Sequence, residues 1–229
     1  MTDPFILCDN LVKIYKVADL EVVALQGLDL AVAAGEMLGI IGASGSGKST
    51  LLNIVGGLDR PSAGRITVDG RDLLKLSDRD LDRYRRAEVG FVWQQTGRNL
   101  IPYLTARENV ELPMTVAGAG LLAKRRRSRE LLEAVGLWEH RRHRLAQLSG
   151  GQQQRLAIAR AISTRPALIL ADEPTGELDS ATGQQVLALL RRIVDEEGAS
   201  VLIATHDLTV DLFADWVYHL KDGALASAL

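Results

Sequence analysis

The residues with the clearest chemical potential form one glycine-rich run, Gly42-Ala43-Ser44-Gly45-Ser46-Gly47-Lys48-Ser49. The run fits the phosphate-loop pattern G-x-x-x-x-G-K-[ST], in which backbone N–H groups converge on phosphate oxygens. Lys48 would place its ammonium against the β- and γ-phosphates, and the Ser49 hydroxyl would coordinate Mg²⁺. The pattern therefore predicts a nucleotide-binding protein, without saying of which kind.

An acidic pair, Asp172-Glu173, directly follows the apolar run at 168–171. An apolar strand that ends in an acid delivers a carboxylate to the C-terminal edge of a sheet, where open α/β folds bind ligands. Asp172 can hold Mg²⁺ together with the phosphate-loop serine, and Glu173 can orient or deprotonate an attacking water. The pair alone is typical of an ordinary strand end, but beside a phosphate loop it indicates nucleotide hydrolysis.

The segment Leu148-Ser149-Gly150-Gly151-Gln152 predicts a second anion site. Ser149 is a good helix N-cap, and the two glycines expose N–H groups at the start of a predicted helix over 152–163. Two phosphate-binding helix starts far apart in one chain indicate that each contacts a different nucleotide. A plain capped helix after a turn explains the same residues equally well.

The elements that must position these residues alternate between strands and helices. Strands are expected at 5–7, 21–25, 28–32, 37–41, 64–70, 89–94, 167–171, 200–204 and 216–220. Helices are expected at 49–55, 72–86, 106–116, 121–135, 152–163, 180–196 and 208–214. This order implies an α/β fold with a mainly parallel, doubly wound sheet and antiparallel strands at the N-terminus. The mostly helical stretch at about 95–164 resembles an inserted subdomain.

Composition narrows the function classes. The 229 residues carry a formal net charge of −2, which does not favour a general binder of nucleic acids or anionic membranes. The single cysteine, Cys8, excludes an intrachain disulfide, which fits a reducing compartment. No signal peptide is expected at the N-terminus, and no apolar run approaches the roughly 20 residues of a membrane helix.

Taken together, these residues resemble the ATP-binding cassette (ABC) ATPases over essentially the whole chain. Residues 148–152 match the family's signature, and Tyr15 matches the aromatic that stacks on adenine. Gln94 matches the glutamine that links Mg²⁺ to the helical subdomain, and His206 the histidine that contacts the γ-phosphate. Asp179 matches part of the loop that crosses the dimer interface.

The resemblance implies three groups of site residues. The catalytic group is Glu173, His206 and Lys48, and the metal ligands are Ser49, Gln94 and Asp172. The residues expected to contact nucleotide are Tyr15, Gly42, Ala43, Ser44, Gly45, Ser46, Gly47, Lys48, Ser49, Thr50, Ser149, Gly150, Gly151, Gln152 and Asp179.

The resemblance also implies a fold and an activity. The fold is a P-loop NTPase core with a mainly parallel sheet, an N-terminal antiparallel β subdomain and an inserted α-helical subdomain. One domain would span 1–229, with the helical subdomain at about 95–164 of a RecA-like core. The activity is hydrolysis of ATP with Mg²⁺ by a homodimer that drives a separate transmembrane permease from the inner face of the cell membrane. Within the family, the motif sequences of this chain are similar to those of the lipoprotein-releasing and macrolide-efflux branch.

Two departures from that branch concern the partner. Three residues, Thr96-Gly97-Arg98, follow the glutamines where the branch usually has one, often aromatic. Glu177 stands where the branch often has asparagine, beside the interface loop. The first departure touches the region expected to meet the permease, and the second could retune dimer closure.

Two other functions are compatible with the phosphate loop. The first is a soluble or mechanotransducing cassette that acts on cell-wall, DNA or translation partners. The basic run at 124–127 favours DNA, although it opens a predicted helix and is better explained as a solvated face. No nucleic acid is therefore expected as a partner. The second is a protein that binds ATP only as a structural switch, which the intact acids and His206 disfavour.

Overall fold

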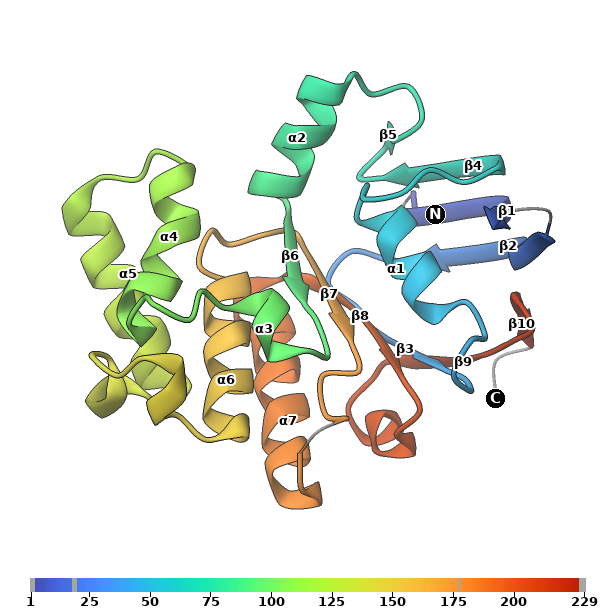
Figure 1. The fold of residues 1–229 in the computed structure, drawn as a ribbon. Coiled ribbons are helices and arrows are strands. Elements are labelled where there is room, and N and C mark those ends of the chain that lie inside the picture. Colours follow the sequence, from blue (N-terminus) through green and yellow to red (C-terminus); the bar gives the residue numbers. More distant parts are fainter. Residues whose placement is uncertain (1–2, 18–19, 177, 227–229) are drawn as a thin grey trace.

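The computed structural model describes residues 3–17, 20–176 and 178–226. Its strands form two sheets, and its helices lie mainly around the larger one (Figure 1). Within these residues no helix is long and apolar enough to cross a membrane. Glu177, where the sequence departs from its branch, lies outside the described residues.

The smaller sheet is antiparallel and comes from the N-terminal part of the chain. Its strands, in spatial order, are β2 (Leu20–Val32), β1 (Ile6–Val17), β4 (Ala63–Val68) and β5 (Arg71–Asp72). The prediction of separate strands at 21–25 and 28–32 is wrong, because β2 continues through Gly27. Leu11 pairs with Leu28 and Val12 with Gln26, so Gly27 is the extra residue of a β-bulge and not a turn.

The larger sheet confirms the predicted parallel core. Its order is β10 (Ala224–Ala226), β9 (Trp216–Lys221), β3 (Met37–Ile41), β8 (Ser200–Thr205), β7 (Leu168–Asp172) and β6 (Val89–Val92). The strands from β9 to β6 are parallel, and β10 returns antiparallel to β9. Parallel strands end at the same edge, so the residues after β3, β7 and β8 are brought together.

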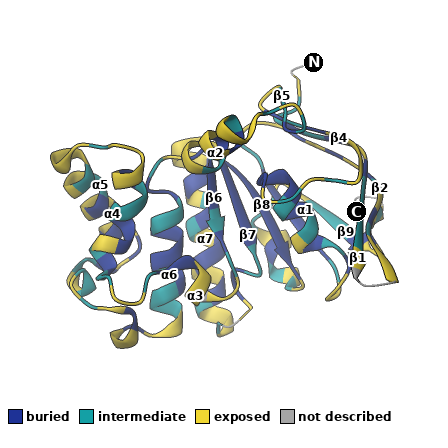
Figure 2. Ribbon diagram, turned by 45° about the horizontal axis from the view of Figure 1, so that its top comes forward, coloured by how far each residue is buried: buried dark blue, intermediate teal, exposed yellow. Residues whose placement is uncertain are grey.

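Helices cover both faces of the larger sheet because alternate strand residues point to opposite sides. Ile40 packs in the same apolar cluster as helix α1 (Lys48–Val55), on one face. Ile41 belongs to the cluster that includes helix α7 (Ser180–Glu197), on the other face. Figure 2 shows β6, β7 and β8 as buried strands between these helices.

A group of helices, which we call the helical region (residues 96–161), extends beyond the β6 edge of the sheet (Figure 1). It contains α3 (Thr96–Asn99), α4 (Ala106–Val116), α5 (Leu121–Ala134), η1 (Trp138–His140), η2 (Leu145–Gln147) and α6 (Gly150–Ala161). The residues inserted after the glutamines form α3. Helix α6 begins two residues before its predicted start, because Ser149 caps it.

Two predicted helices differ from the structure. The helix expected at 72–86 is α2 (Asp78–Ala87), because the Ser77 side chain accepts a hydrogen bond from the Asp80 amide and starts the helix there. The helix expected at 208–214 is only a short 3₁₀ turn, η3 (Leu208–Leu212). No residue that was predicted for the site lies in either of these two segments.

Candidate functional site

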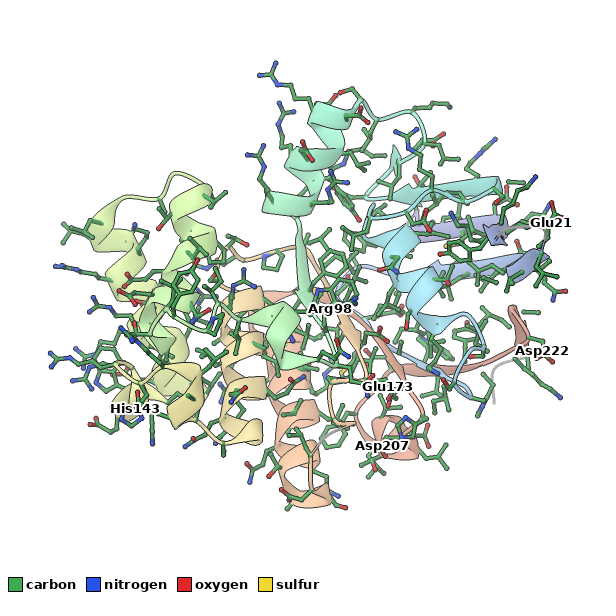
Figure 3. All side chains as sticks on the ribbon, viewed as in Figure 1. Glu21, Arg98, His143, Glu173, Asp207 and Asp222 are labelled. Carbon is green, nitrogen blue, oxygen red and sulfur yellow. The ribbon has the colours of Figure 1, made fainter. Side chains whose placement is uncertain are left out.

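A pocket of about 620 Å³ lies at the carboxyl ends of the parallel strands. The phosphate loop (residues 42–49) follows β3, the acidic pair lies at the end of β7, and His206 follows β8. Figure 3 shows Glu173 and Asp207 on the loops after β7 and β8. The residues that line the pocket are Val22, Val23, Ala24, Ser44, Gly45, Gly47, Lys48, Ser49, Thr50, Gln94, Asp172, Glu173 and His206.

The phosphate loop is packed too tightly for side chains at two of its glycines. A Cβ on Gly42 would lie 2.3 Å from the carbonyl oxygen of Leu220, and one on Gly47 would lie 2.4 Å from that of Ala24. At Gly45, by contrast, a Cβ would have no described atom within 4 Å. The loop backbone is therefore held from behind and open in front, as a phosphate cradle requires.

Lys48 is held at the mouth of this cradle. Its side chain is almost fully buried, and Nζ donates hydrogen bonds to the carbonyl oxygens of Gly42 (2.7 Å) and Ala43 (3.0 Å). Hydrogen bonds to charged acceptors are about twice as strong as those to neutral ones, so a phosphate would compete well with these carbonyls. Lys48 can thus bind an anion with little rearrangement.

Asp172, at the end of β7, lies next to the phosphate-loop serine. Burial raises the pKa of its carboxyl, while a hydrogen bond with Ser49 and the nearby charges of Lys48 and Arg98 act in the opposite direction. The neighbouring charge of Glu173 raises the pKa further. Two carboxylates and a lysine share one half-buried site, and a divalent cation there would relieve the repulsion between the carboxylates.

Glu173 has a strained backbone at the centre of the site. Its φ is 48°, a left-handed conformation that is costly for a residue with a side chain. Its amide donates to the Ala204 carbonyl oxygen (2.7 Å), which fixes the residue against the end of β8. Strain that the surrounding structure maintains is typical of active sites.

The Glu173 carboxylate is oriented by the chain that follows β8. Its Oε2 accepts a hydrogen bond from Thr205 Oγ1 (3.0 Å) and lies 2.9 Å from Nδ1 of His206. Its Oε1 lies 3.8 Å from Lys48 Nζ. Thr205 was not predicted from the sequence, because a buried threonine at a strand end has no distinctive pattern.

Gln94 and Tyr15 are placed differently with respect to the pocket. Gln94, in the loop after β6, lines it, and its contact with Mg²⁺ remains a prediction. Tyr15 does not line it; the Tyr15 hydroxyl donates to Asp59 Oδ2 (2.8 Å), and Lys13 Nζ lies 4.7 Å from the centre of its ring. Stacking of Tyr15 on adenine remains a prediction.

The apolar wall of the pocket was missed. Val22 and Val23, on β2, line the pocket although about half of each side chain is exposed. Val22 pairs directly with Tyr15 across the two strands, so their side chains share one face of the smaller sheet. No local sequence pattern marks these two valines as residues of the site.

The signature residues lie outside this pocket. Ser149 is the N-cap of α6; its hydroxyl accepts from the Gln152 amide (3.3 Å), and its own amide donates to Gln152 Oε1 (2.9 Å). Ser149 and Gly150 are exposed, and none of the residues 149–152 is among those that line the pocket in the described structure. The two predicted anion sites therefore do not meet within one chain.

Asp179 joins the signature residues instead of the phosphate loop. It is the N-cap of α7, where its side chain accepts from the Thr182 amide (3.0 Å). A Cβ on Gly151 would lie 2.7 Å from Thr182 Cγ2, so the starts of α6 and α7 are neighbours. The predicted site residues thus form two separate groups on one chain.

Comparisons with known proteins agree with this arrangement. The family described as ABC transporter matches residues 25–176, more than half of the chain. The lipoprotein-releasing system ATP-binding protein LolD 2 of Caulobacter vibrioides is 47% identical, over 98% of both chains. The macrolide export ATP-binding/permease protein MacB of Wolinella succinogenes is 45% identical over 98% of this chain but only 34% of its own length.

A solved structure is similar over the same extent. It is a dimer of the ATP-binding cassette MJ0796 in a post-hydrolysis state with ADP and phosphate, with a TM-score of 0.90 and 42% identity. The alignment covers 98% of this chain and 97% of that one. MJ0796 comes from Methanocaldococcus jannaschii.

Proposed function

This chain belongs to the ABC transporter family, and from that premise we propose how its residues divide the work of ATP hydrolysis. The chain is an ATP-binding, ATP-hydrolysing transporter subunit of the kind that forms dimers. The observation that carries the proposal is the meeting of Lys48, Asp172 and Glu173 in one pocket, while Ser149 lies outside it.

Each ATP would be bound between two copies of the chain. The phosphate loop and Lys48 of one copy would hold the phosphates, and residues 149–151 of the other would approach the γ-phosphate from the opposite side. The two helix starts carry partial positive charge, so the phosphate anion attracts both and favours closure. Hydrolysis removes part of that anionic bridge and allows the dimer to open.

Glu173 would act on the attacking water. Because Thr205 and His206 hold its Oε2, its Oε1 is directed toward Lys48 and the phosphate position. The side chain of His206 is exposed, so it can contact the γ-phosphate while it keeps Glu173 oriented. Pre-oriented groups of this kind supply most of the acceleration in phosphoryl transfer.

The residues present fit Mg²⁺ as well as ATP. Ser49, Gln94 and Asp172 supply a hydroxyl, an amide and a carboxylate oxygen on one pocket, which are ligands that Mg²⁺ prefers. When bound, Mg²⁺ would neutralise charge that develops on the phosphates.

The apolar wall would hold the adenine base. Val22 lies next to Tyr15 across the two strands, and the Tyr15 ring is held by Asp59 and Lys13. We propose that the base lies across Val22 and reaches Tyr15.

A permease would dock where the helical region meets the larger sheet. A groove of about 290 Å³ there is lined by Phe91, Trp93, Val116 and Arg160 among others. The Asn99 side chain pairs with the backbone of Trp93 (2.8 and 2.6 Å), which joins α3 to the residue that precedes Gln94. Movement of a partner in the groove would therefore reach Gln94 directly. We propose that residues 95–164 act as a subdomain that carries this movement.

By analogy with the named relatives, the transporter that this subunit serves would perform efflux or lipoprotein release. Such a subunit would work at the inner face of the cell membrane, held there by the permease. The alternative cassettes that act on DNA, translation or cell-wall partners gain no support from a specific feature of the described residues.

The test is Glu173→Gln with Glu139→Gln as the matched control, because Glu139 is an exposed acid in η1. Loss of a general base should lower turnover about 10²- to 10⁴-fold, while ATP affinity persists. The Glu173→Gln chain should then accumulate as an ATP-bound dimer in size-exclusion chromatography, and Glu139→Gln should behave as the wild type. Normal turnover of Glu173→Gln would remove Glu173 from this role.

A further inference from the structure

The turn between β9 and β10, at residues 222–223, lies directly against the phosphate loop. The amide of Gly223 donates to the Ser46 carbonyl oxygen (3.1 Å), and the Gly223 carbonyl accepts from the Gln26 amide (2.8 Å). One residue of the turn therefore ties the phosphate loop to strand β2. Asp222, in the same turn, lies on the opposite side of the molecule from the helical region (Figure 3).

The contact leaves no room for a side chain at Gly223. Its φ is 78°, and a Cβ there would lie 2.9 Å from the Ala24 carbonyl oxygen and 3.0 Å from Leu25 Cα. A Cβ on Gly47 would meet the same Ala24 oxygen. The turn and the phosphate loop are thus packed against one short stretch of β2 backbone.

The strand before the turn supports the other end of the loop. The Leu220 carbonyl oxygen lies only 2.3 Å from the ideal position of a Cβ on Gly42, so it blocks a side chain there. The end of β9 and the following turn therefore touch both the first glycine of the phosphate loop and its Ser46–Gly47 peptide. This support comes from a part of the chain about 180 residues away in sequence.

The hydrogen bond from Gly223 has a consequence for the nucleotide site. In a trans peptide unit the C=O and N–H point in opposite directions. Because the Ser46 carbonyl points at Gly223, the N–H of Gly47 in the same peptide unit points away from the turn. Gly47 is one of the residues that line the pocket, so an amide turned away from the β9–β10 turn is available to a phosphate bound there.

We infer that Gly223 is a positioning residue that holds the phosphate loop in its binding conformation, an inference that rests on the proposed function. The β9–β10 turn is the rear support of the nucleotide site, although no residue of it touches the pocket. A change at Gly223 should weaken nucleotide binding and leave the chemistry of the bound complex intact.

The experiment compares Gly223→Ala with Gly198→Ala. Gly198 ends α7 at φ 70° with no described atom within 4 Å of an added Cβ, so it carries the same backbone strain without the collision. Gly223→Ala should raise the Kd and KM for ATP roughly tenfold, as expected for one misplaced charge-assisted hydrogen bond. Its kcat at saturating ATP should stay near the wild-type value, and Gly198→Ala should change neither constant.

A second measurement covers the case in which Gly223→Ala does not fold. In the wild type, ATP should slow hydrogen exchange of the Gly223 amide and leave that of Gly198, which donates to Val194, unchanged. Equal ATP affinity of the two alanine variants, or a Gly223 amide that ATP does not protect although it protects the phosphate loop, would overturn the inference alone. A wild type that neither binds nor hydrolyses ATP would instead refute the proposed function and the inference with it.

Discussion

The two glycine-containing helix starts of this chain satisfy their backbone groups in opposite ways. At α1 the N-cap is Gly47, in a left-handed conformation and with no side-chain cap, so the first N–H groups remain available. At α6 the N-cap is Ser149, which forms a reciprocal capping box with Gln152. The first helix start is also enclosed by the pocket, whereas the second is exposed.

The difference indicates which of the two is a complete site in one chain. The α1 start has a lysine, two acids and open backbone donors, and it is stabilised only when an anion binds. The α6 start satisfies itself and has no pocket of its own, so it can contribute to ATP only when another copy presents one. Changes at α1 should therefore affect binding by a single chain, and changes at α6 should affect the dimer.

The largest effect that separates the two regions is expected for Lys48→Ala. Removal of a charge-assisted contact of about 1.5 to 3 kcal/mol should weaken ATP binding by roughly 10- to 100-fold. The effect should appear even at protein concentrations at which the chain is monomeric. Isothermal titration calorimetry would measure it.

The matched control for Lys48→Ala is Lys124→Ala, because Lys124 is a half-buried lysine outside the pocket that donates a hydrogen bond to Thr115 in the helical region. Unaltered ATP affinity in Lys48→Ala would contradict the phosphate-loop assignment. Lost affinity in Lys124→Ala would show that any lysine matters equally, and would remove the contrast between the regions.

A smaller effect is expected for Ser149→Ala, and it should appear only at protein concentrations at which the dimer forms. ATP binding by the monomer should be unchanged, while turnover of the dimer should fall on the order of tenfold because one hydrogen bond to the γ-phosphate is lost. The lost cap should also cost about 1 kcal/mol of stability. Steady-state ATPase assays at several protein concentrations would measure the first effect, and thermal unfolding the second.

Ser77→Ala provides the control for Ser149→Ala. Ser77 caps α2 through the same type of hydrogen bond, but its helix lies away from the pocket. Ser77→Ala should lose similar stability and keep its turnover. If both variants lose turnover equally, Ser149 acts only as a cap and the α6 start has no role in ATP hydrolysis.

The sequence predicts the α1 region more fully than its surroundings. The phosphate loop, the acids and the parallel strands follow from local patterns, because glycine spacing and apolar runs are short-range features. The helix predicted at 72–86 starts too early, because Leu73, Leu74 and Leu76 have helical spacing although the Ser77 cap starts the helix at Asp78. These leucines precede the helix and do not belong to it.

Contacts between distant segments could not be predicted. Val22 enters the pocket only because the smaller sheet packs beside the phosphate loop, and Gly223 supports the loop only because β9 is next to β3. Thr205 orients Glu173 from another strand. Each of these residues acts through a partner far away in sequence, which no local pattern records.

The smallest effect concerns stability in the absence of ligand. Burial raises the pKa of Asp172, so its ionised form is less favourable in the folded chain than in the unfolded chain. The penalty is complete above the folded pKa and disappears below the unfolded pKa. Asp172→Asn should therefore raise the Tm of the nucleotide-free protein at neutral pH, on the order of 2 °C, although it abolishes Mg²⁺-dependent turnover.

Asp215→Asn should do the reverse. Burial opposes ionisation there too, but hydrogen bonds from the Met37 amide and Arg191 hold the pKa of Asp215 below its usual value. Its ionised form therefore stabilises the fold, and the contribution is lost as the pH falls through the lowered pKa.

Thermal unfolding from pH 8 to pH 4 should show the advantage of Asp172→Asn shrinking as Asp172 of the wild type becomes protonated. A Tm of Asp172→Asn at or below the wild type at neutral pH would mean that the acids beside α1 are already satisfied, as the cap of α6 is, and that the contrast between the two helix starts does not hold.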